Sequence, residues 1–117
     1  MNIKEQVQKM DAMLSQGAIV EAVKAFFDPE ANTSDYGNGG TKGKAEMISK
    51  MESFAGSIAK VNGITHHHSI VDDKVSASEF TFDFEMKDGS NIYWHEIIRR
   101  IWNNEGKVIH EEYFNAA

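Results

Sequence analysis

The spacing of apolar residues along the chain changes near residue 64 from a helical period to an extended one. Before that point apolar residues recur every three or four positions, which is typical of helices that bury one face. In the first segment these residues are Ile3, Val7, Met10 and Leu14. Asn2 with Glu5 resembles a capping box at its start. The pattern predicts helices at residues 1–16, 18–27 and 43–61, with a short extended piece at 30–36.

From residue 64 onward apolar and polar residues alternate, as they do in strands. Asp88-Gly89 is a strong hairpin signal between two of these segments. The predicted strands are residues 64–71, 75–86, 92–102 and 107–114. Helices followed by an antiparallel meander predict an α+β fold, with three N-terminal helices packed against one face of the sheet.

The alternation does not decide which face of the strand at residues 75–86 points inward. Phe80, Phe82 and Phe84 lie on one face of that strand, and Glu79, Thr81 and Asp83 lie on the other. A change of one residue in the hairpin register would exchange the two sets.

The hairpin at residues 91–114 carries large apolar groups and charges on both faces. One face of its first strand holds Trp94, Glu96, Ile98, Arg100 and Trp102. The other face holds Tyr93, His95, Ile97, Arg99 and Ile101. An ordinary half-buried strand is apolar on one side and polar on the other. This hairpin therefore indicates a sheet with a cavity on one face and a partner on the other.

Composition narrows the classes of function. A chain of 117 residues with 41% hydrophobic residues is expected to form one domain, residues 1–117, around one core. The net charge of −6 argues against nucleic acid as a partner. The absence of cysteine excludes a thiolate nucleophile and a cysteine-ligated metal. The sequence has no apolar run long enough to span a membrane and no signal-peptide pattern, so we expect a cytoplasmic protein without a membrane partner.

Several short segments in a characteristic order carry a family resemblance. They are Gly17-Ala18-Ile19-Val20, Phe26-Phe27-Asp28-Pro29-Glu30-Ala31, Gly43-Lys44-Ala45-Glu46-Met47-Ile48, the turn from Trp102 to Ile109, and Glu112-Tyr113-Phe114. In this order and spacing the chain resembles the NTF2-like superfamily, particularly the SnoaL-like polyketide cyclases and the ketosteroid isomerases. The resemblance implies a curved antiparallel sheet wrapped around helices as an open cone with a pocket inside. It also implies a homodimer formed through the outer face of the sheet.

The resemblance to the isomerases implies a position for the general base, but the two oxyanion donors of that family are missing from this sequence. An aspartate shortly after the second helix is the general base of that family, and Asp35 lies at this place. Met10 and Ile98 fall where the family has its tyrosine and aspartic acid oxyanion donors. Neither side chain can donate a hydrogen bond to an enolate, which argues against the full steroid isomerase mechanism. Asp35 is either a base with a raised pKa at the cone mouth or a loop aspartate that bonds its own backbone.

Glu96 and Arg100 share a face with Trp94 and Trp102 and could orient a ligand beside an apolar wall. The alternative is a partly buried ion pair with no chemical role. Arg100 with Glu96 and Asp83 imitates only loosely the aspartate–arginine–aspartate set of the limonene epoxide hydrolases in the same superfamily. Tyr113, near the end of the last strand, is a candidate hydrogen-bond donor to the ligand.

His66-His67-His68 would place His66 and His68 on one face of a regular strand, as in metal-binding H-x-H pairs. We interpret these two histidines instead as polar groups of the pocket that assist acid–base chemistry near neutral pH. No metal and no organic cofactor is assigned. The predicted function is therefore binding of a small apolar or aromatic molecule in the cone, with cofactor-independent isomerase, cyclase or dehydratase chemistry at Asp35. The alternative is a non-catalytic ligand-binding or dimerisation domain.

Overall fold

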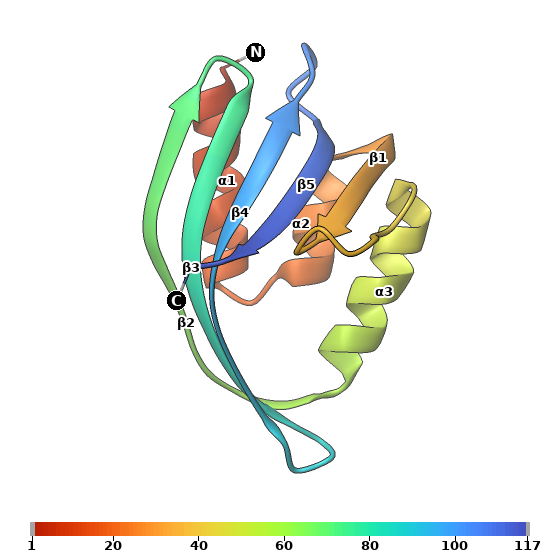
Figure 1. The fold of residues 1–117 in the computed structure, drawn as a ribbon, viewed down its shortest axis with the longest axis vertical. Helices are drawn as coiled ribbons and strands as arrows, with labels where there is room; N and C mark the ends of the chain where they lie inside the picture. The colour runs from red at the N-terminus through yellow and green to blue at the C-terminus, as the bar shows by residue number, and fades with distance from the viewer. Residues whose placement is uncertain (1, 117) are drawn as a thin grey trace.

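The computed structural model describes residues 2–116, which form three helices and five strands (Figure 1). Their order along the chain is α1 (Ile3–Ser15), α2 (Ile19–Phe26), β1 (Phe27–Asp35), α3 (Lys44–Gly56), β2 (Ile58–Asp72), β3 (Val75–Met86), β4 (Asn91–Trp102) and β5 (Val108–Asn115). The predicted α+β fold is confirmed. Asn2 caps α1, since its side-chain oxygen accepts a hydrogen bond from the Glu5 backbone nitrogen at 3.1 Å.

The sheet has the strand order β1-β5-β4-β3-β2, and every neighbouring pair is antiparallel except β1 with β5, which is parallel. The prediction of a purely antiparallel four-strand sheet was therefore wrong. The segment 27–35 contains Pro29 and mostly polar residues, so it lacks the alternation that marks an interior strand. It forms an edge strand, the place in a sheet where proline is tolerated.

The third helix ends at Gly56, earlier than the predicted residue 61. Residues 58–61 instead begin the long strand β2, where Val61 pairs with Phe84 of β3. Ile58 continues the apolar spacing of the helix, so local periodicity could not separate the two elements. Cross-strand pairing with β3 supplies the backbone hydrogen bonds that decide the strand.

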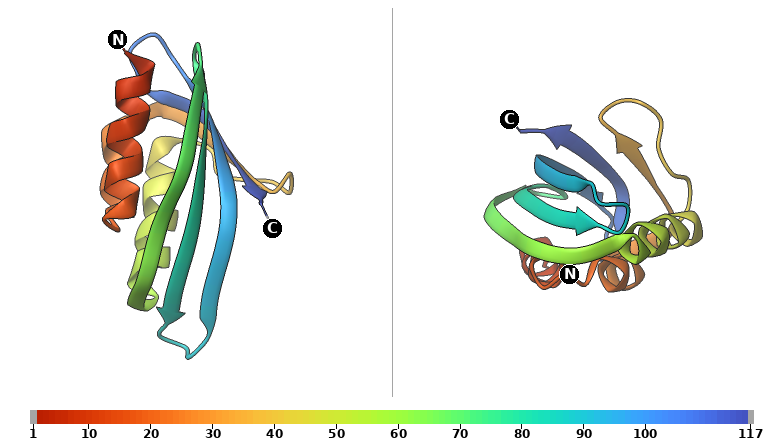
Figure 2. Two further views of the ribbon diagram at one scale, coloured as in Figure 1. Left: turned by 90° about the vertical axis from the view of Figure 1, so that its left-hand side faces the viewer. Right: turned by 90° about the horizontal axis from the view of Figure 1, so that it is seen from below.

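All three helices cover one concave face of the twisted sheet, and the opposite face carries no helix (Figures 1 and 2). The even-numbered residues of β3 and β4 point toward the helices. They include the buried Phe80, Phe82, Phe84, Ile98 and Trp102. This orientation answers the question left open for β3 and confirms that Glu96 and Arg100 lie on the inner face. Within residues 2–116, no helix is long and apolar enough to cross a membrane.

Candidate functional site

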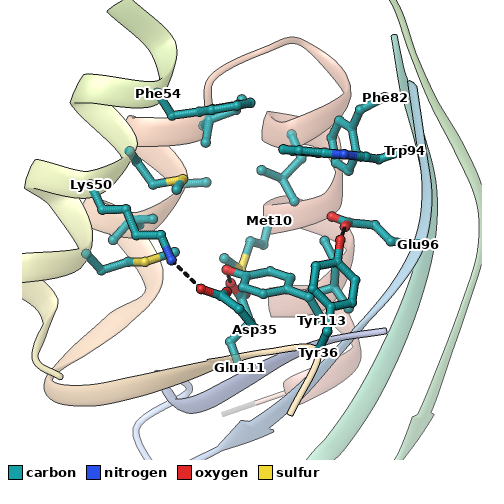
Figure 3. A pocket seen from close by; sticks show the side chains of 17 residues that line it. Met10, Asp35, Tyr36, Lys50, Phe54, Phe82, Trp94, Glu96, Glu111 and Tyr113 are labelled. Atoms are coloured by element: carbon teal, nitrogen blue, oxygen red, sulfur yellow. Dashed lines mark hydrogen bonds and ion pairs between the residues drawn. The ribbon is translucent and has the colours of Figure 1, made fainter. Parts of the chain in front are cut away.

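A cavity of about 470 Å³ lies between the helices and the inner face of the sheet (Figure 3). Most of its lining is apolar, with methionines, aliphatic residues and aromatic rings supplied by all three helices and by β3 and β4. The apolar lining residues are Met10, Leu14, Ile19, Ala22, Val23, Met47, Met51, Phe54, Phe82, Trp94 and Ile98. Phe54 of α3 stacks on Trp94 of β4, with ring centroids 5.5 Å apart and planes at 15°. This stack joins the third helix to the sheet across the cavity.

The polar lining groups come from the two strands at the β1 edge, from β4 and from α3. They are Asp35, Tyr36, Lys50, Glu96, Glu111 and Tyr113. In Figure 3 Asp35, Tyr36, Glu111 and Tyr113 gather at one end of the cavity, away from the Phe54 and Trp94 rings. The arrangement suits a molecule that is apolar over most of its surface and carries a polar group at one end.

The end of β1 positions two of these groups. Asp35 is the last residue of the strand, and its Oδ2 lies 2.7 Å from Lys50 Nζ on α3. Tyr36 follows with a left-handed backbone, φ 54°, which is uncommon for a residue other than glycine. Its phenol donates a hydrogen bond of 2.7 Å to Glu96 Oε2. Neighbouring residues thus reach opposite walls of the cavity.

Backbone hydrogen bonds hold this corner in place. The nitrogen and carbonyl of Thr33 pair with the carbonyl and nitrogen of Thr41, so the chain folds back on itself beyond β1. Gly40 passes so close that an added Cβ would lie 1.6 Å from the Thr33 carbonyl oxygen. Only glycine fits that approach, which is why the glycine-rich loop can support Asp35 and Tyr36.

Glu96 is a titratable group whose setting differs from that of Asp35. Its side chain is buried, and desolvation raises its pKa, while the hydrogen bond from Tyr36 partly opposes that rise. The negative charges of Glu111 and Asp35 add to the increase. Asp35, in contrast, has a side chain that is 36% exposed and paired with an ammonium group. Carboxyls in such different surroundings can serve different roles in proton transfer.

Tyr113 and Glu111 form the remaining polar wall. The Tyr113 phenol donates a hydrogen bond to the Glu111 carboxylate, and burial is the main cause that raises the pKa of Tyr113. Tyr36 is 47% exposed, and its partial desolvation, with the hydrogen bond to Glu96, raises the pKa of its phenol. Both phenols therefore stay protonated over the ordinary pH range and remain hydrogen-bond donors.

A buried ion network lies behind this wall. Arg100 is fully buried, with Nε 2.9 Å from Glu111 Oε2 and Nη1 3.0 Å from Asp11 Oδ1. Burial alone would lower the pKa of Arg100, but the charges of Glu111 and Asp11 outweigh it and raise that pKa. The Ser78 hydroxyl donates to Asp11 Oδ2 at 2.9 Å and accepts from Arg100 Nη1 at 3.2 Å. The network holds Glu111 in place and so positions the Tyr113 phenol.

The predicted site residues divide between the cavity and its surroundings. Asp35, Trp94, Glu96 and Tyr113 line the cavity. Arg100 and Trp102 are buried outside its lining. The indole nitrogen of Trp102 donates to Ser76 Oγ at 2.9 Å, and its ring meets Phe26 edge-on at 6.2 Å. Trp102 is therefore a core residue, and Arg100 acts on the cavity through Glu111.

His66 and His68 lie outside the cavity lining, and the prediction that they share one face was wrong. The register of β2 against β3 shifts between these two residues, so His66 pairs with Phe80 and His68 with Glu79. His66 faces inward, with Nε2 2.7 Å from Ser69 Oγ and 3.5 Å from Asp11 Oδ2. A bulge of this kind re-aims side chains relative to a regular strand.

Sequence reasoning missed four groups of the site, namely Asp11, Tyr36, Lys50 and Glu111. One of these four residues, Asp11, could have been identified from the sequence. Asp11 lies next to Met10 on the stripe that faces the core, and a charged residue on such a stripe indicates a buried partner. Arg100 on the inner face of β4 was the available partner.

No protein-family model matches the chain, and no curated protein sequence matches it. Solved structures with a similar fold do match the chain. One, described as a SnoaL-like polyketide cyclase from Mesorhizobium loti, superposes with a TM-score of 0.86 at 21% identity, over 97% of this chain and 99% of that one. An uncharacterised cystatin-fold protein from Novosphingobium aromaticivorans gives 0.82 at 13% identity, over 98% and 99% of the two chains.

A third structure is a hypothetical protein with a ketosteroid isomerase-like fold from Catenulispora acidiphila, in complex with trimethylamine. It gives a TM-score of 0.75 at 12% identity, over 94% of this chain and 84% of that one. At such low identities these likenesses establish the fold alone, and that fold is the NTF2-like fold expected from the sequence.

Proposed function

We propose that this NTF2-like protein binds a small, mainly apolar molecule in its inner cavity and transfers a proton next to a carbonyl group of that molecule. The observation that carries the proposal is the division of the cavity lining. An apolar space of about 470 Å³ ends at a group of carboxyls and phenols. Apolar walls with a few convergent polar groups are typical of small-molecule sites.

The proposed chemistry assigns separate roles to the two carboxyls nearest Tyr36. Asp35 is the base, because its paired and half-exposed carboxylate can reach a proton at the cavity wall. Burial raises the pKa of Glu96, which holds the Tyr36 phenol in place by accepting its hydrogen bond. The phenols of Tyr36 and Tyr113 donate hydrogen bonds to the oxygen that gains charge, exchanging their present acceptors, Glu96 and Glu111, for that oxygen. Met10 and Ile98 line the cavity but have no group that can donate a hydrogen bond. In this scheme the hydrogen-bond donors are therefore the phenols of Tyr36 and Tyr113. No organic cofactor takes part in this scheme.

Ligand binding is tested with N-phenyl-1-naphthylamine, a neutral apolar probe that fluoresces in dry sites. Met51→Trp adds bulk inside the cavity, and Ile70→Trp adds the same side chain at an exposed position, 72% accessible, outside it. We expect the first variant to weaken probe binding at least about tenfold and the second to leave it unchanged. Equal binding by the two variants, both folded by circular dichroism, would place the probe elsewhere and overturn the binding proposal.

Catalysis is tested by hydrogen–deuterium exchange at the α-carbon of cyclohexenone and related cyclic ketones, followed by proton NMR in deuterated buffer. We expect the protein to accelerate exchange, and Asp35→Asn to remove most of that acceleration. Asp72→Asn, at an exposed position, is the control. A ketone that displaces the probe but shows no accelerated exchange would favour the alternative, a non-catalytic binding protein.

We also propose a homodimer formed through the outer face of the sheet, the face without helices. This face exposes Tyr93 and Phe114, which are 70% and 42% accessible. It also carries the Arg99–Glu112 ion pair, so it can meet a second copy with both apolar and oppositely charged groups. Light scattering after gel filtration would test this, since Tyr93→Lys combined with Phe114→Lys should give a monomer.

A further inference from the structure

The outer face of the sheet carries a second group of side chains that the cavity chemistry does not use. His67 of β2, Glu79 of β3 and His95 of β4 each offer one ligand atom, and these atoms all lie within 4.8 Å of one another. His95 Nε2 is 2.6 Å from Glu79 Oε2, and the His67 and His95 rings are 5.2 Å apart between centroids. Three adjacent strands thus direct their side chains to one point.

His67 reaches this group by the ordinary alternation of β2. Its neighbour His66 pairs with the inward-facing Phe80, so the next residue faces outward. There the ring nitrogen Nε2 of His67 lies 2.7 Å from Thr81 Oγ1. The register shift between His66 and His68 changes the face of His68, which pairs with the outward-facing Glu79.

We propose that His67, Glu79 and His95 form a binding site for a divalent transition metal ion of the zinc type. Two imidazoles and one carboxylate favour zinc, cobalt or nickel over calcium or magnesium, which prefer oxygen ligands. Three protein ligands leave at least one coordination position open, as in zinc sites that also bind water.

The observed spacing needs only small side-chain movements to become a coordination sphere. Ligand atoms about 2.0–2.2 Å from a tetrahedral ion lie about 3.3–3.6 Å from one another. The 2.6 Å contact between His95 and Glu79 must therefore open slightly, and the wider separations, at most 4.8 Å, must close. In the single protomer the side chains of His95 and Glu79 are 32% and 30% exposed, so an ion can reach them there without unfolding of the sheet. Because the proposed dimer uses the same face, its two copies must leave this group uncovered.

The electrostatics of this face also suit a cation. Glu79 contributes an acidic side chain beside the two imidazoles. The net charge of −6 favours the approach of cations to the protein. A bound ion would link β2, β3 and β4 and stabilise the folded state by mass action.

The site is tested on tag-free, chelator-treated protein by calorimetric titration with zinc chloride and by visible absorption with cobalt chloride. We expect one equivalent of either ion to bind. His67→Gln, Glu79→Gln and His95→Gln should each weaken binding at least about tenfold. Zinc should raise the melting temperature of the wild-type protein and of no ligand variant.

His110→Gln is the matched control. His110 is also a strand histidine beside a carboxylate, with Nε2 3.0 Å from Glu112 Oε1, and it lies outside the three-ligand group. We expect this variant to bind zinc as the wild type does. The absence of stoichiometric binding, unchanged affinity in the ligand variants, or an equal loss in His110→Gln would overturn the proposal. The site lies on the face opposite the cavity, so probe binding to the cavity is expected to be the same with and without zinc, and either proposal can fail alone.

Discussion

The phenol of Tyr36 donates a 2.7 Å hydrogen bond to the carboxylate of Glu96, 60 residues further along the chain. This bond connects the end of the edge strand β1 to the middle of β4 and joins the two walls of the cavity's polar end. It also couples the titration of Glu96 to the end of β1, where Asp35 lies. Burial raises the pKa of Glu96 and this hydrogen bond opposes the rise. The following predictions test that balance and the residues that support it.

Replacing Glu96 with glutamine should change how stability depends on pH. The pKa of Glu96 is raised above its ordinary value of 4.5, so the folded state binds its proton more tightly than the unfolded state does. This contribution to stability is fully present below pH 4.5 and is lost as pH rises through the folded-state value. Glutamine cannot lose a proton.

The stability of Glu96→Gln relative to the wild type should therefore increase as pH rises above the ordinary glutamate value. Each unit by which the folded-state pKa exceeds that value adds about 1.4 kcal/mol to the difference. Urea unfolding between acidic and neutral pH would measure it. A difference that stays constant over this range would show that Glu96 titrates as it does in the unfolded chain.

Removing the Tyr36 hydroxyl should raise the pKa of Glu96 further. The hydrogen bond from Tyr36 is the interaction that lowers this pKa against the effect of burial, so Tyr36→Phe leaves burial and the neighbouring charges unopposed. Carbon-detected NMR titration of the glutamate carboxyls would follow the change. Tyr93→Phe, on an exposed tyrosine of the outer face, is the control and should leave the Glu96 titration in place. A downward shift in Tyr36→Phe would contradict the assigned role of the phenol.

Two neighbouring arginines should differ widely in their effect on stability. Arg100→Met leaves the buried carboxylates of Asp11 and Glu111 without their cation, and we expect a loss of about 3–5 kcal/mol in the free energy of unfolding. Arg99 has a side chain that is 40% exposed and lies 3.4 Å from Glu112, so Arg99→Met should cost about 1 kcal/mol or less. Denaturant unfolding at neutral pH compares the two variants. Similar losses would mean that the buried network contributes no more than the surface pair.

Gly40→Ala should disturb the corner that carries Asp35 and Tyr36. The new Cβ would collide with the Thr33 carbonyl, and the paired backbone of Thr33 and Thr41 would have to separate. We expect a loss of more than about 2 kcal/mol in stability and weaker probe binding in the cavity. Gly56→Ala is the control, because a Cβ there meets no atom within 4 Å. It should be neutral or slightly stabilising. Normal stability in Gly40→Ala would show that the loop can move away from β1 at little cost.

The sequence by itself determined the class of the fold and much of the inner face of the sheet. Helical and extended periods are local properties, so the three helices, the hairpin turn at Asp88-Gly89 and the alternation in β4 could be predicted from spacing. The same alternation placed Trp94, Glu96 and Ile98 on one face, and the structure confirms it. The resemblance of short segments to NTF2-like proteins also predicted the open cone and the place of Asp35.

Only the tertiary structure decided how distant segments meet. The polar segment 27–35 became a strand by pairing in parallel with β5, and a bulge that no periodicity marks put His68 on the face opposite His66. Asp11 met Arg100 across 89 residues, and Tyr36 reached Glu96 through a left-handed backbone supported by the close approach of Gly40. These contacts depend on register and on the packing of helices against the sheet. Local patterning leaves register and packing undetermined, because many arrangements satisfy the same alternation of apolar and polar residues.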